Sequence, residues 1–221
     1  MFWEQRDRQL LSGDLVPKLA REAYAGKNVI ELGCGGGCNL LSMSGLPGRW
    51  VGIDPMPVAI QLLPVLAEAA GLPVPEALEA AAEDVPFADN EFDIALCYSS
   101  HQYMDLHLAF AEMDRIVHDA GEVYIIGGIL GPFVLESVGR FVKGRSLGTL
   151  KYDVGAMANT VSYQFRGRRA IGGGSDNATS TPIYPTARWM RRQLASHNFV
   201  VDDAASARLP GCEMAVLAHR R

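Results

Sequence analysis

Four glycines stand close together directly after a short apolar run. Residues 27–32 read as a buried strand, Gly33-Cys34-Gly35-Gly36-Gly37 follows, and a helix-like sequence starts near Cys38. Glycine lets the backbone turn sharply and approach a ligand closely. A G-x-G-x-x-G dinucleotide fingerprint that starts at Gly33 would need its third glycine where the chain has Cys38. The loop therefore indicates a ligand site that matches a pyrophosphate site poorly.

A carboxylate ends the next predicted strand. Residues 50–54 read WVGID, so Asp54 stands at the strand's carboxyl end, 21 residues after Gly33. A charged acceptor there can bind a ribose diol through two hydrogen bonds. The alternative interpretation is a turn or cap residue, and the spacing from Gly33 also suits a dehydrogenase.

A third segment, residues 82–93 with the sequence AEDVPFADNEFD, is more specific. It resembles the A-E-D-L-P-F-x-D-x-x-F-D segment of small-molecule and lipid methyltransferases, the type 11-like group. The sequence ELGCGGG at residues 31–37 likewise resembles the E/D-x-G-x-G-x-G motif of class I S-adenosylmethionine-dependent methyltransferases. A weaker similarity to the family's E-x-x-R-V-L-K-P-G-G segment covers residues 112–122 and implies an architectural role.

The resemblance implies S-adenosyl-L-methionine as the cofactor. The glycine loop would bend around its amino-acid end, Asp54 would bind the ribose, and the loop at residues 82–85 would hold the adenine. Many relatives carry Asp where this chain has Ala81, so Glu83 or Asp84 is the substitute candidate for the adenine amine. The cofactor-binding residues that the resemblance implies are Glu31, Gly33, Cys34, Gly35, Asp54, Pro55, Met56, Ala82, Glu83, Asp84, Val85, Tyr98 and Ser99.

The segment after the predicted fourth strand, residues 98–104, would face the transferred methyl group in this fold. It contains His101, which can take a proton near neutral pH and is the candidate catalytic residue. A hydrogen-bonded structural histidine is the rival interpretation. Tyr98 and Tyr103 are candidates for stacking near the sulfonium or the substrate, or for core packing.

Arginines concentrate in the second half of the chain. Arg140 and Arg145 are candidate substrate contacts, because the guanidinium group suits a carboxylate or phosphate. An acceptor with an acidic group is one interpretation, and a solvated surface is the other. The net charge of −5 and the lack of interleaved aromatic residues argue against nucleic acid as a partner.

Strand and helix patterns alternate as far as residue 128, which predicts an α/β fold with a parallel sheet and helices on both faces. The resemblance implies a Rossmann-like sheet of seven strands, ordered 3-2-1-4-5-7-6, with only strand 7 antiparallel. We expect a single domain over residues 1–221, with its parts as follows: an N-terminal helix (1–26), a cofactor-binding core (27–128), an inserted helical cap over the site that orders on binding (129–184), and a closing helix and β-hairpin (185–221).

Composition argues against membrane-spanning, secreted and metal-binding classes of protein. Hydrophobic residues make up 48% of the chain, yet no continuous run reaches the roughly 18 apolar residues of a membrane span. The charged N-terminal sequence does not resemble a signal peptide, so we expect a cytoplasmic protein. Cys34 and Cys38 are spaced C-x3-C, which is an uncommon zinc spacing, and no metal site is expected.

These features together predict methyl transfer from S-adenosylmethionine to a small-molecule acceptor by in-line displacement. The sequence does not decide whether the attacking atom of the acceptor is oxygen, nitrogen or carbon. It does not indicate the oligomeric state either. Two alternatives remain: a non-catalytic module that binds S-adenosylmethionine, and an NAD(P)-dependent oxidoreductase, against which the glycine spacing argues.

Overall fold

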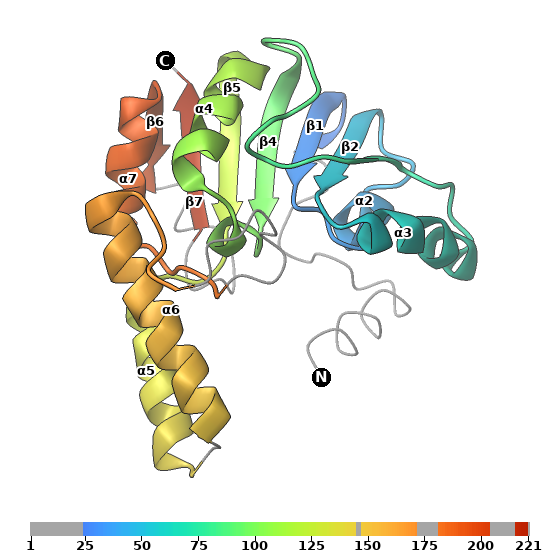
Figure 1. Ribbon diagram of the computed structural model, residues 1–221. Coiled ribbons are helices and arrows are strands. Elements are labelled where there is room, and N and C mark those ends of the chain that lie inside the picture. The colour runs from blue at the N-terminus through green and yellow to red at the C-terminus, as the bar shows by residue number, and fades with distance from the viewer. Residues whose placement is uncertain (1–23, 145–146, 172–180, 204–214, 221) are drawn as a thin grey trace.

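The computed structural model describes residues 24–144, 147–171, 181–203 and 215–220 (Figure 1). The predicted N-terminal helix at residues 1–26 falls largely outside these ranges, and residues 204–214 of the predicted closing β-hairpin also lie outside them. The elements are, in chain order, β1 (Lys27–Leu32), α2 (Cys38–Ser42), β2 (Gly48–Asp54), α3 (Pro57–Ala70), β3 (Glu76–Glu79), β4 (Phe92–Tyr98), the 3-10 turn η2 (His101–Tyr103), α4 (Leu106–Ile116), β5 (Val117–Ile126), α5 (Leu130–Val142), α6 (Leu147–Arg166), α7 (Ala187–Ser196), β6 (Phe199–Asp202) and β7 (Ala215–Arg220).

One seven-stranded sheet forms the centre of the fold, and its order is β3-β2-β1-β4-β5-β7-β6. Strands β1 to β5 pair in parallel, whereas β7 is antiparallel to both β5 and β6. The predicted strand order and the antiparallel seventh strand are confirmed. Because the carboxyl ends of β1, β2 and β4 lie at one edge, the loops that follow these strands meet there.

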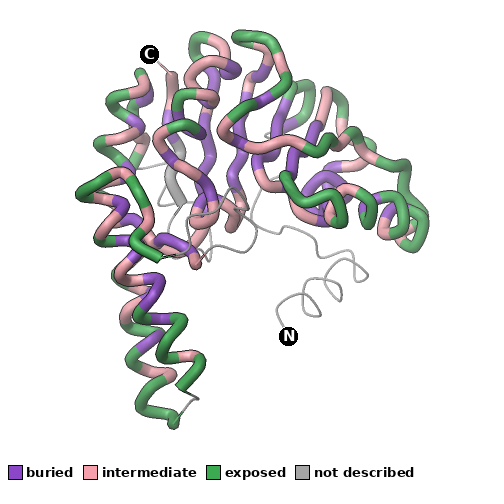
Figure 2. The backbone as a smooth tube through the Cα atoms, in the orientation of Figure 1, coloured by how far each residue is buried: buried purple, intermediate pink, exposed green. Residues whose placement is uncertain are grey.

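Helices cover both faces of the sheet, and the central strands are buried along most of their length (Figure 2). Two separate clusters of buried side chains lie on the two faces. On one face, Ile30 packs in a cluster with Phe110 of α4 and Leu194 of α7. On the other face, Val29 packs with Met43 and Tyr24. The central strands are thereby fixed on both sides, which gives the loops at their ends a rigid support.

The helices α5 and α6 form a hairpin that leaves the sheet edge and extends away from the core (Figure 1). Arg140 of α5 donates to Asp153 of α6 at 2.7 Å, and Asp153 is only 3% exposed. The sequence shows no clear helical period here, because glycines at 131, 139, 148 and 155 interrupt the apolar pattern. The covering of the site by residues 129–184 stays a prediction.

Two further details differ from the sequence interpretation. Strand β3 was not located from the sequence, and β5 begins at Val117, inside the segment at residues 112–122 that resembles a family motif. Its early part contains Ala120 with φ of 65° and Gly121, which interrupt the apolar run. Among the described residues, no helix has the length and apolar character to cross a membrane.

Candidate active site

The glycine loop turns tightly between β1 and α2. Gly33, Gly35 and Gly37 have φ of 74°, 54° and 72°, a region that side chains disfavour. The N–H groups of Gly33 and Cys34 both donate to the carbonyl oxygen of Ile53, at 2.8 and 2.9 Å. A Cβ added at Gly33 would lie 2.4 Å from that of Ser100. The loop therefore needs glycine for its conformation and for its close approach to the segment after β4.

Asp54 lies at the carboxyl end of β2 and is only 8% exposed. Its Oδ2 accepts the N–H of Gly35 at 2.9 Å, and its Oδ1 accepts the N–H of Met56 at 2.9 Å. The carboxylate thus connects the glycine loop to the segment containing Pro55 and Met56. Each carboxylate oxygen has a second lone pair, so the group can accept further hydrogen bonds from a ligand hydroxyl.

Glu31 is buried beneath the glycine loop. Its Oε1 accepts a short hydrogen bond from the side chain of Asn39, which is also buried. This contact holds the first turn of α2 against β1. Asn39 was not singled out from the sequence, where only its position in the helix that follows the glycine loop could have indicated it. The arrangement lets Glu31 support the loop from below.

The loop at residues 82–85 is fixed by α4. Ala82 and Val85 are buried, and Val85 donates its N–H to Glu112 at 2.8 Å. The carbonyl oxygen of Val85 accepts from Arg115 at 2.8 Å. The Arg115 side chain also binds Glu112, and this contact lowers the pKa of the Glu112 carboxyl group. The helix that the sequence indicated as architectural thereby sets the position of the predicted adenine loop.

The carboxylate of Glu83 is hydrogen-bonded to another part of the protein. Its Oε1 accepts the N–H of Asp105 at 2.6 Å, and Oδ1 of Asp105 accepts the Tyr163 hydroxyl at 2.7 Å. Asp105 also caps α4 by accepting the N–H of His107. The predicted adenine loop is therefore linked through Asp105 to the far end of α6, a link that the sequence did not indicate. Asp84 is exposed at the same loop.

The link between Asp105 and Tyr163 supports a stability prediction. Tyr163→Phe removes the hydroxyl that donates to Asp105, and we expect a loss of about 1 kcal/mol in the free energy of unfolding. Asp105 keeps the His107 N–H, which limits the loss. Urea unfolding of Tyr163→Phe, Asp105→Ala and the double variant would measure the coupling. Strictly additive effects would show that this hydrogen bond contributes nothing.

The segment after β4 lies directly beside the glycine loop. Ser100 donates its hydroxyl to the carbonyl oxygen of Leu32 at 2.7 Å, which joins the ends of β4 and β1. Ser99 has a positive φ of 54°, so the chain turns sharply there before η2. Tyr98 is half-buried and packs against the cluster that contains Trp50 and Tyr124.

His101 is fully buried in this segment. Its Nε2 lies 3.1 Å from the carbonyl oxygen of Gly128, so Nε2 carries the proton. Nδ1 is buried and has no hydrogen-bond partner among the described residues. Burial lowers the pKa of His101 to about 4, so the ring is neutral at pH 7. A Cβ added at Gly127 would lie 2.6 Å from the imidazole Cε1, so the ring needs glycine at that position.

Arg169 fixes the same segment from the other side. Its guanidinium group donates to the carbonyl oxygens of Gln102 and Met104, at 3.2 and 3.0 Å. Desolvation by burial lowers the pKa of Arg169. The sequence analysis did not single out Arg169 among the arginines of the second half of the chain. The Arg169 side chain thus holds the backbone of the segment that carries His101.

The three predicted substrate contacts have different surroundings. Tyr103 is half-buried in η2, two residues after His101. The Arg140 guanidinium already pairs with Asp153 and with Glu136, at 2.7 and 2.6 Å. Arg145 lies outside the described residues. Of the three, the structure brings Tyr103 close to the candidate catalytic residue.

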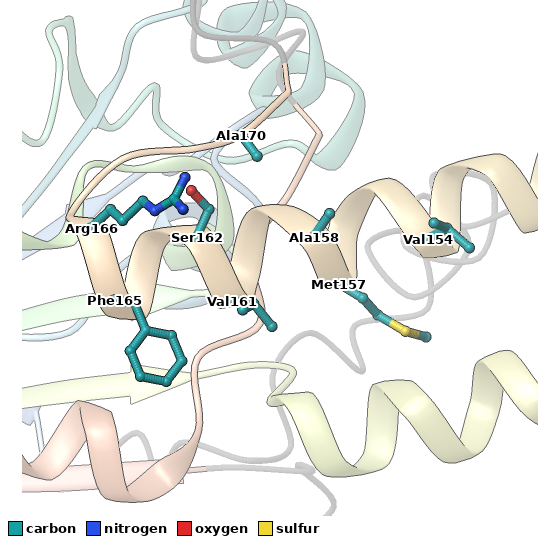
Figure 3. A pocket seen from close by; sticks show the side chains of 8 residues that line it. All are labelled: Val154, Met157, Ala158, Val161, Ser162, Phe165, Arg166 and Ala170. Carbon is teal, nitrogen blue, oxygen red and sulfur yellow. The ribbon is translucent and has the colours of Figure 1, made fainter.

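A groove of about 650 Å³ runs along the outer face of α6 (Figure 3). None of the predicted site residues lines it, so it is separate from the candidate active site. Its lining residues are Val154, Met157, Ala158, Val161, Ser162, Phe165, Arg166 and Ala170. Within the described part of the chain, no three His, Cys, Asp or Glu residues are grouped in a way that could hold a metal ion.

Comparison with known proteins supports the interpretation of the motifs. Residues 30–125, which contain the glycine loop, Asp54 and the loop at residues 82–85, match the family model described as a methyltransferase domain. Over these residues the chain is similar to class I methyltransferases. The cofactor of this class is S-adenosylmethionine, and the geometry of the two loops around Asp54 fits it.

Two curated relatives share part of this methyltransferase domain. The uncharacterized methyltransferase YcgJ of Bacillus subtilis is 26% identical over 106 residues, which cover 48% of this chain and 42% of the relative. A ubiquinone biosynthesis O-methyltransferase of a Methylobacterium strain is 28% identical over 132 residues, 58% of this chain and 48% of the relative. The chain thus spans about half the length of the curated relatives it matches.

A solved structure extends the comparison to the whole fold. Geranyl diphosphate C-methyltransferase from Streptomyces coelicolor, solved with Mg²⁺, geranyl diphosphate and S-adenosyl-L-homocysteine, superposes with a TM-score of 0.59. The match covers 99% of this chain and 79% of that chain, at 15% sequence identity. Such low identity establishes a shared architecture and no shared acceptor.

Proposed function

We propose that the protein transfers a methyl group from S-adenosylmethionine to a small-molecule acceptor in the cytoplasm. The observation that carries this proposal is the carboxylate of Asp54, held at 2.9 Å from the N–H of Gly35. A strand-end carboxylate beside a glycine turn offers acceptors for a ribose diol and open backbone for a charged amino-acid group. The matched family supports the same assignment.

Each loop has a proposed share in holding the cofactor. Gly33, Cys34 and Gly35 would contact its amino-acid end, with Glu31 supporting the turn, and Asp54 would accept the ribose hydroxyls. The backbone of the loop at residues 82–85 would hold the adenine. Because the Glu83 carboxylate already accepts the Asp105 N–H, the exposed Asp84 is the better candidate for the adenine amine. Pro55 and Met56 would lie against the ring, and Tyr98 and Ser99 would line the side nearest β4.

The reaction needs little chemistry from the protein. Bound S-adenosylmethionine supplies an electrophilic methyl group on a sulfonium that is already a good leaving group. The chain must align the acceptor with that methyl group, and proximity alone can supply several kcal/mol. A group that accepts the acceptor's proton adds a further contribution when the nucleophile is a hydroxyl or an ammonium.

We propose His101 as that proton acceptor. Gly128 fixes the tautomer, which leaves the lone pair of Nδ1 for a substrate proton. The ring has no exposed surface, so an acceptor could reach Nδ1 only after the segment at residues 98–104 or its cover moves. Tyr103, two residues further on, is the proposed neighbour of the acceptor.

The acceptor does not need an acidic group in this proposal. Arg140 is the described arginine that was expected to bind such a group, and its charge is already shared with Asp153 and Glu136. Removing it from that pair would leave the buried Asp153 without compensation. The proposal therefore rests on shape and alignment at the carboxyl edge of the sheet.

Calorimetry on one sample with S-adenosylmethionine, S-adenosylhomocysteine and NADH tests the cofactor assignment. We expect saturable binding of the first two ligands and none of NADH. Binding of NADH alone would favour an oxidoreductase and overturn the proposal. Binding of both sulfur ligands, without methyl transfer to any member of an acceptor panel assayed with labelled cofactor, would favour the non-catalytic binding module.

A further inference from the structure

The end of α5 and the start of α6 expose large apolar side chains to solvent. Phe141 is 65% exposed, Val142 is 78% exposed and Leu147 is 85% exposed. We call residues 141–144 and 147–151 the hairpin tip. Scattered apolar side chains are ordinary on a surface, but three such residues gathered at the end of a projecting hairpin mark a contact surface (Figure 1).

The hairpin tip is also basic in a chain that is acidic overall. Residues 138–169 contain seven Lys and Arg against a single Asp, while the whole chain carries a net charge of −5. Between Ser137 and Tyr152 the sequence has four basic residues and no acidic one. Lys143 and Lys151, which flank the apolar side chains, are both exposed. The charge and the apolar surface thus occur together on one short segment.

This combination favours one kind of partner over two others. Two copies of the hairpin would bring their positive charges together, which opposes self-association through this surface. Phe141 is the one aromatic side chain among the three, and Val142 and Leu147 cannot stack on bases, which makes nucleic acid a poorer match than lipid. An anionic lipid surface offers negative headgroups for the lysines and an apolar boundary for the other side chains.

We propose that the hairpin tip docks on an anionic lipid surface. Phe141, Val142 and Leu147 enter the boundary between headgroups and acyl chains, and Lys143 and Lys151 contact the headgroups. The proposed contact is peripheral, with the hairpin tip lying in the interface of one leaflet. The inference goes beyond methyl transfer and does not rest on it.

The direction of the hairpin gives this contact a consequence. α5 begins four residues after the end of β5, so the hairpin leaves from the same sheet edge that carries the glycine loop and Asp54 (Figure 1). A protein held by its hairpin tip would therefore turn the candidate active site toward the lipid.

Vesicle flotation of the full chain tests the proposal. Vesicles of phosphatidylcholine alone are compared with vesicles that also contain phosphatidylglycerol, at low and at high salt. We expect binding to the anionic vesicles, weakening with salt because the attraction between the lysines and the headgroups is screened. Binding to phosphatidylcholine alone should be at least about 10-fold weaker, since only the apolar contact remains.

Variants separate the two parts of the contact. Lys143→Gln with Lys151→Gln should weaken binding to anionic vesicles about 30-fold, because each lysine near such a surface contributes about fivefold. Phe141→Ser with Leu147→Ser should weaken it about 10-fold or more. The matched control is Val65→Ser, which changes an apolar residue on α3 that is 58% exposed and should leave binding as in the wild type. Unchanged circular dichroism in each variant checks the fold.

Four results would overturn the inference. Equal binding to both vesicle types would show that anionic headgroups are not recognised. Absent binding, or hairpin variants that float like the wild type, would remove the hairpin tip from any lipid contact. Light scattering that shows a dimer in solution, converted to monomer by Phe141→Ser with Leu147→Ser, would make the same residues an interface between copies of the chain. None of these results bears on cofactor binding, which calorimetry measures separately.

Discussion

Replacing His101 with glutamine is expected to slow methyl transfer about 100- to 10,000-fold, with the affinity for S-adenosylmethionine nearly unchanged. Glutamine can still donate a hydrogen bond to the carbonyl oxygen of Gly128, which His101 Nε2 now contacts. It cannot take up the proton that Nδ1 would accept. The single-turnover rate with labelled cofactor measures the chemical step, and calorimetry measures the affinity.

The pH dependence of the wild-type rate should reflect the burial of His101. Because burial lowers its pKa to about 4, the ring stays neutral and able to accept a proton above about pH 5. A solvent-exposed histidine would instead lose this ability below about pH 6.5. We therefore expect a rate that is flat from about pH 5 to pH 8 as far as this group is concerned, with a fall only near pH 4.

The burial of His101 also makes the free energy of unfolding depend on pH. In the unfolded chain His101 binds a proton below about pH 6.5, whereas in the folded chain it stays neutral down to about pH 4. The unfolded state therefore binds more protons in this window, and the free energy of unfolding decreases as the pH falls through it. His118, whose pKa is raised by Asp93, contributes with the opposite sign in both proteins. The difference between wild type and His101→Gln, from urea unfolding at pH 7 and pH 5, isolates His101.

A rate that changes less than about 10-fold in His101→Gln would contradict the proton-acceptor role. If the stability difference still followed the expected sign, His101 would be a buried structural residue. Alignment alone would then carry the reaction, as it can for a nucleophile that is already activated. The rate thus tests whether His101 accepts a proton in the reaction. The stability difference tests whether His101 is buried in its neutral form, as the structure has it.

The parts of the site that could be predicted from the sequence are those set by short-range rules. A turn with positive φ favours glycine, so the glycine cluster indicates Gly33 and Gly35 without any knowledge of the fold. A carboxylate that ends a buried strand, as Asp54 does, is equally visible. Strand β3 could not be located from the sequence because it lies at the edge of the sheet and is largely exposed. It has no alternating pattern that would indicate a strand.

Contacts between distant segments could not be predicted in the same way. Arg169 binds the carbonyl oxygens of Gln102 and Met104 only because the chain returns from α6 to the end of β4. Glu83 looked available for a ligand, yet it accepts the N–H of Asp105 once α4 is in place. Side-chain type and spacing carry no information on such pairings, which depend on how the insertion packs against the sheet.

Replacing Asp54 with alanine is expected to weaken S-adenosylmethionine binding about 10- to 150-fold, the cost of losing a charge-assisted hydrogen bond. The physical reason has two parts. The proposed contact with the ribose hydroxyls is lost, and the N–H groups of Gly35 and Met56 lose the acceptors that now fix them. Glu68→Ala, which removes an exposed carboxylate from α3, is the matched control and should bind as the wild type does.

Adenosine separates the two parts of the Asp54 effect, because it carries the ribose and the adenine but lacks the amino-acid end. If Asp54 acts through the ribose, Asp54→Ala should weaken adenosine and S-adenosylmethionine by similar factors. If it acts only by holding the glycine loop, the affinity for adenosine should stay unchanged while that for S-adenosylmethionine falls, because that loop would contact the amino-acid end. Unchanged affinity for both ligands in a variant with a native circular dichroism spectrum would remove Asp54 from the cofactor site, and with it the observation on which the proposed function depends most.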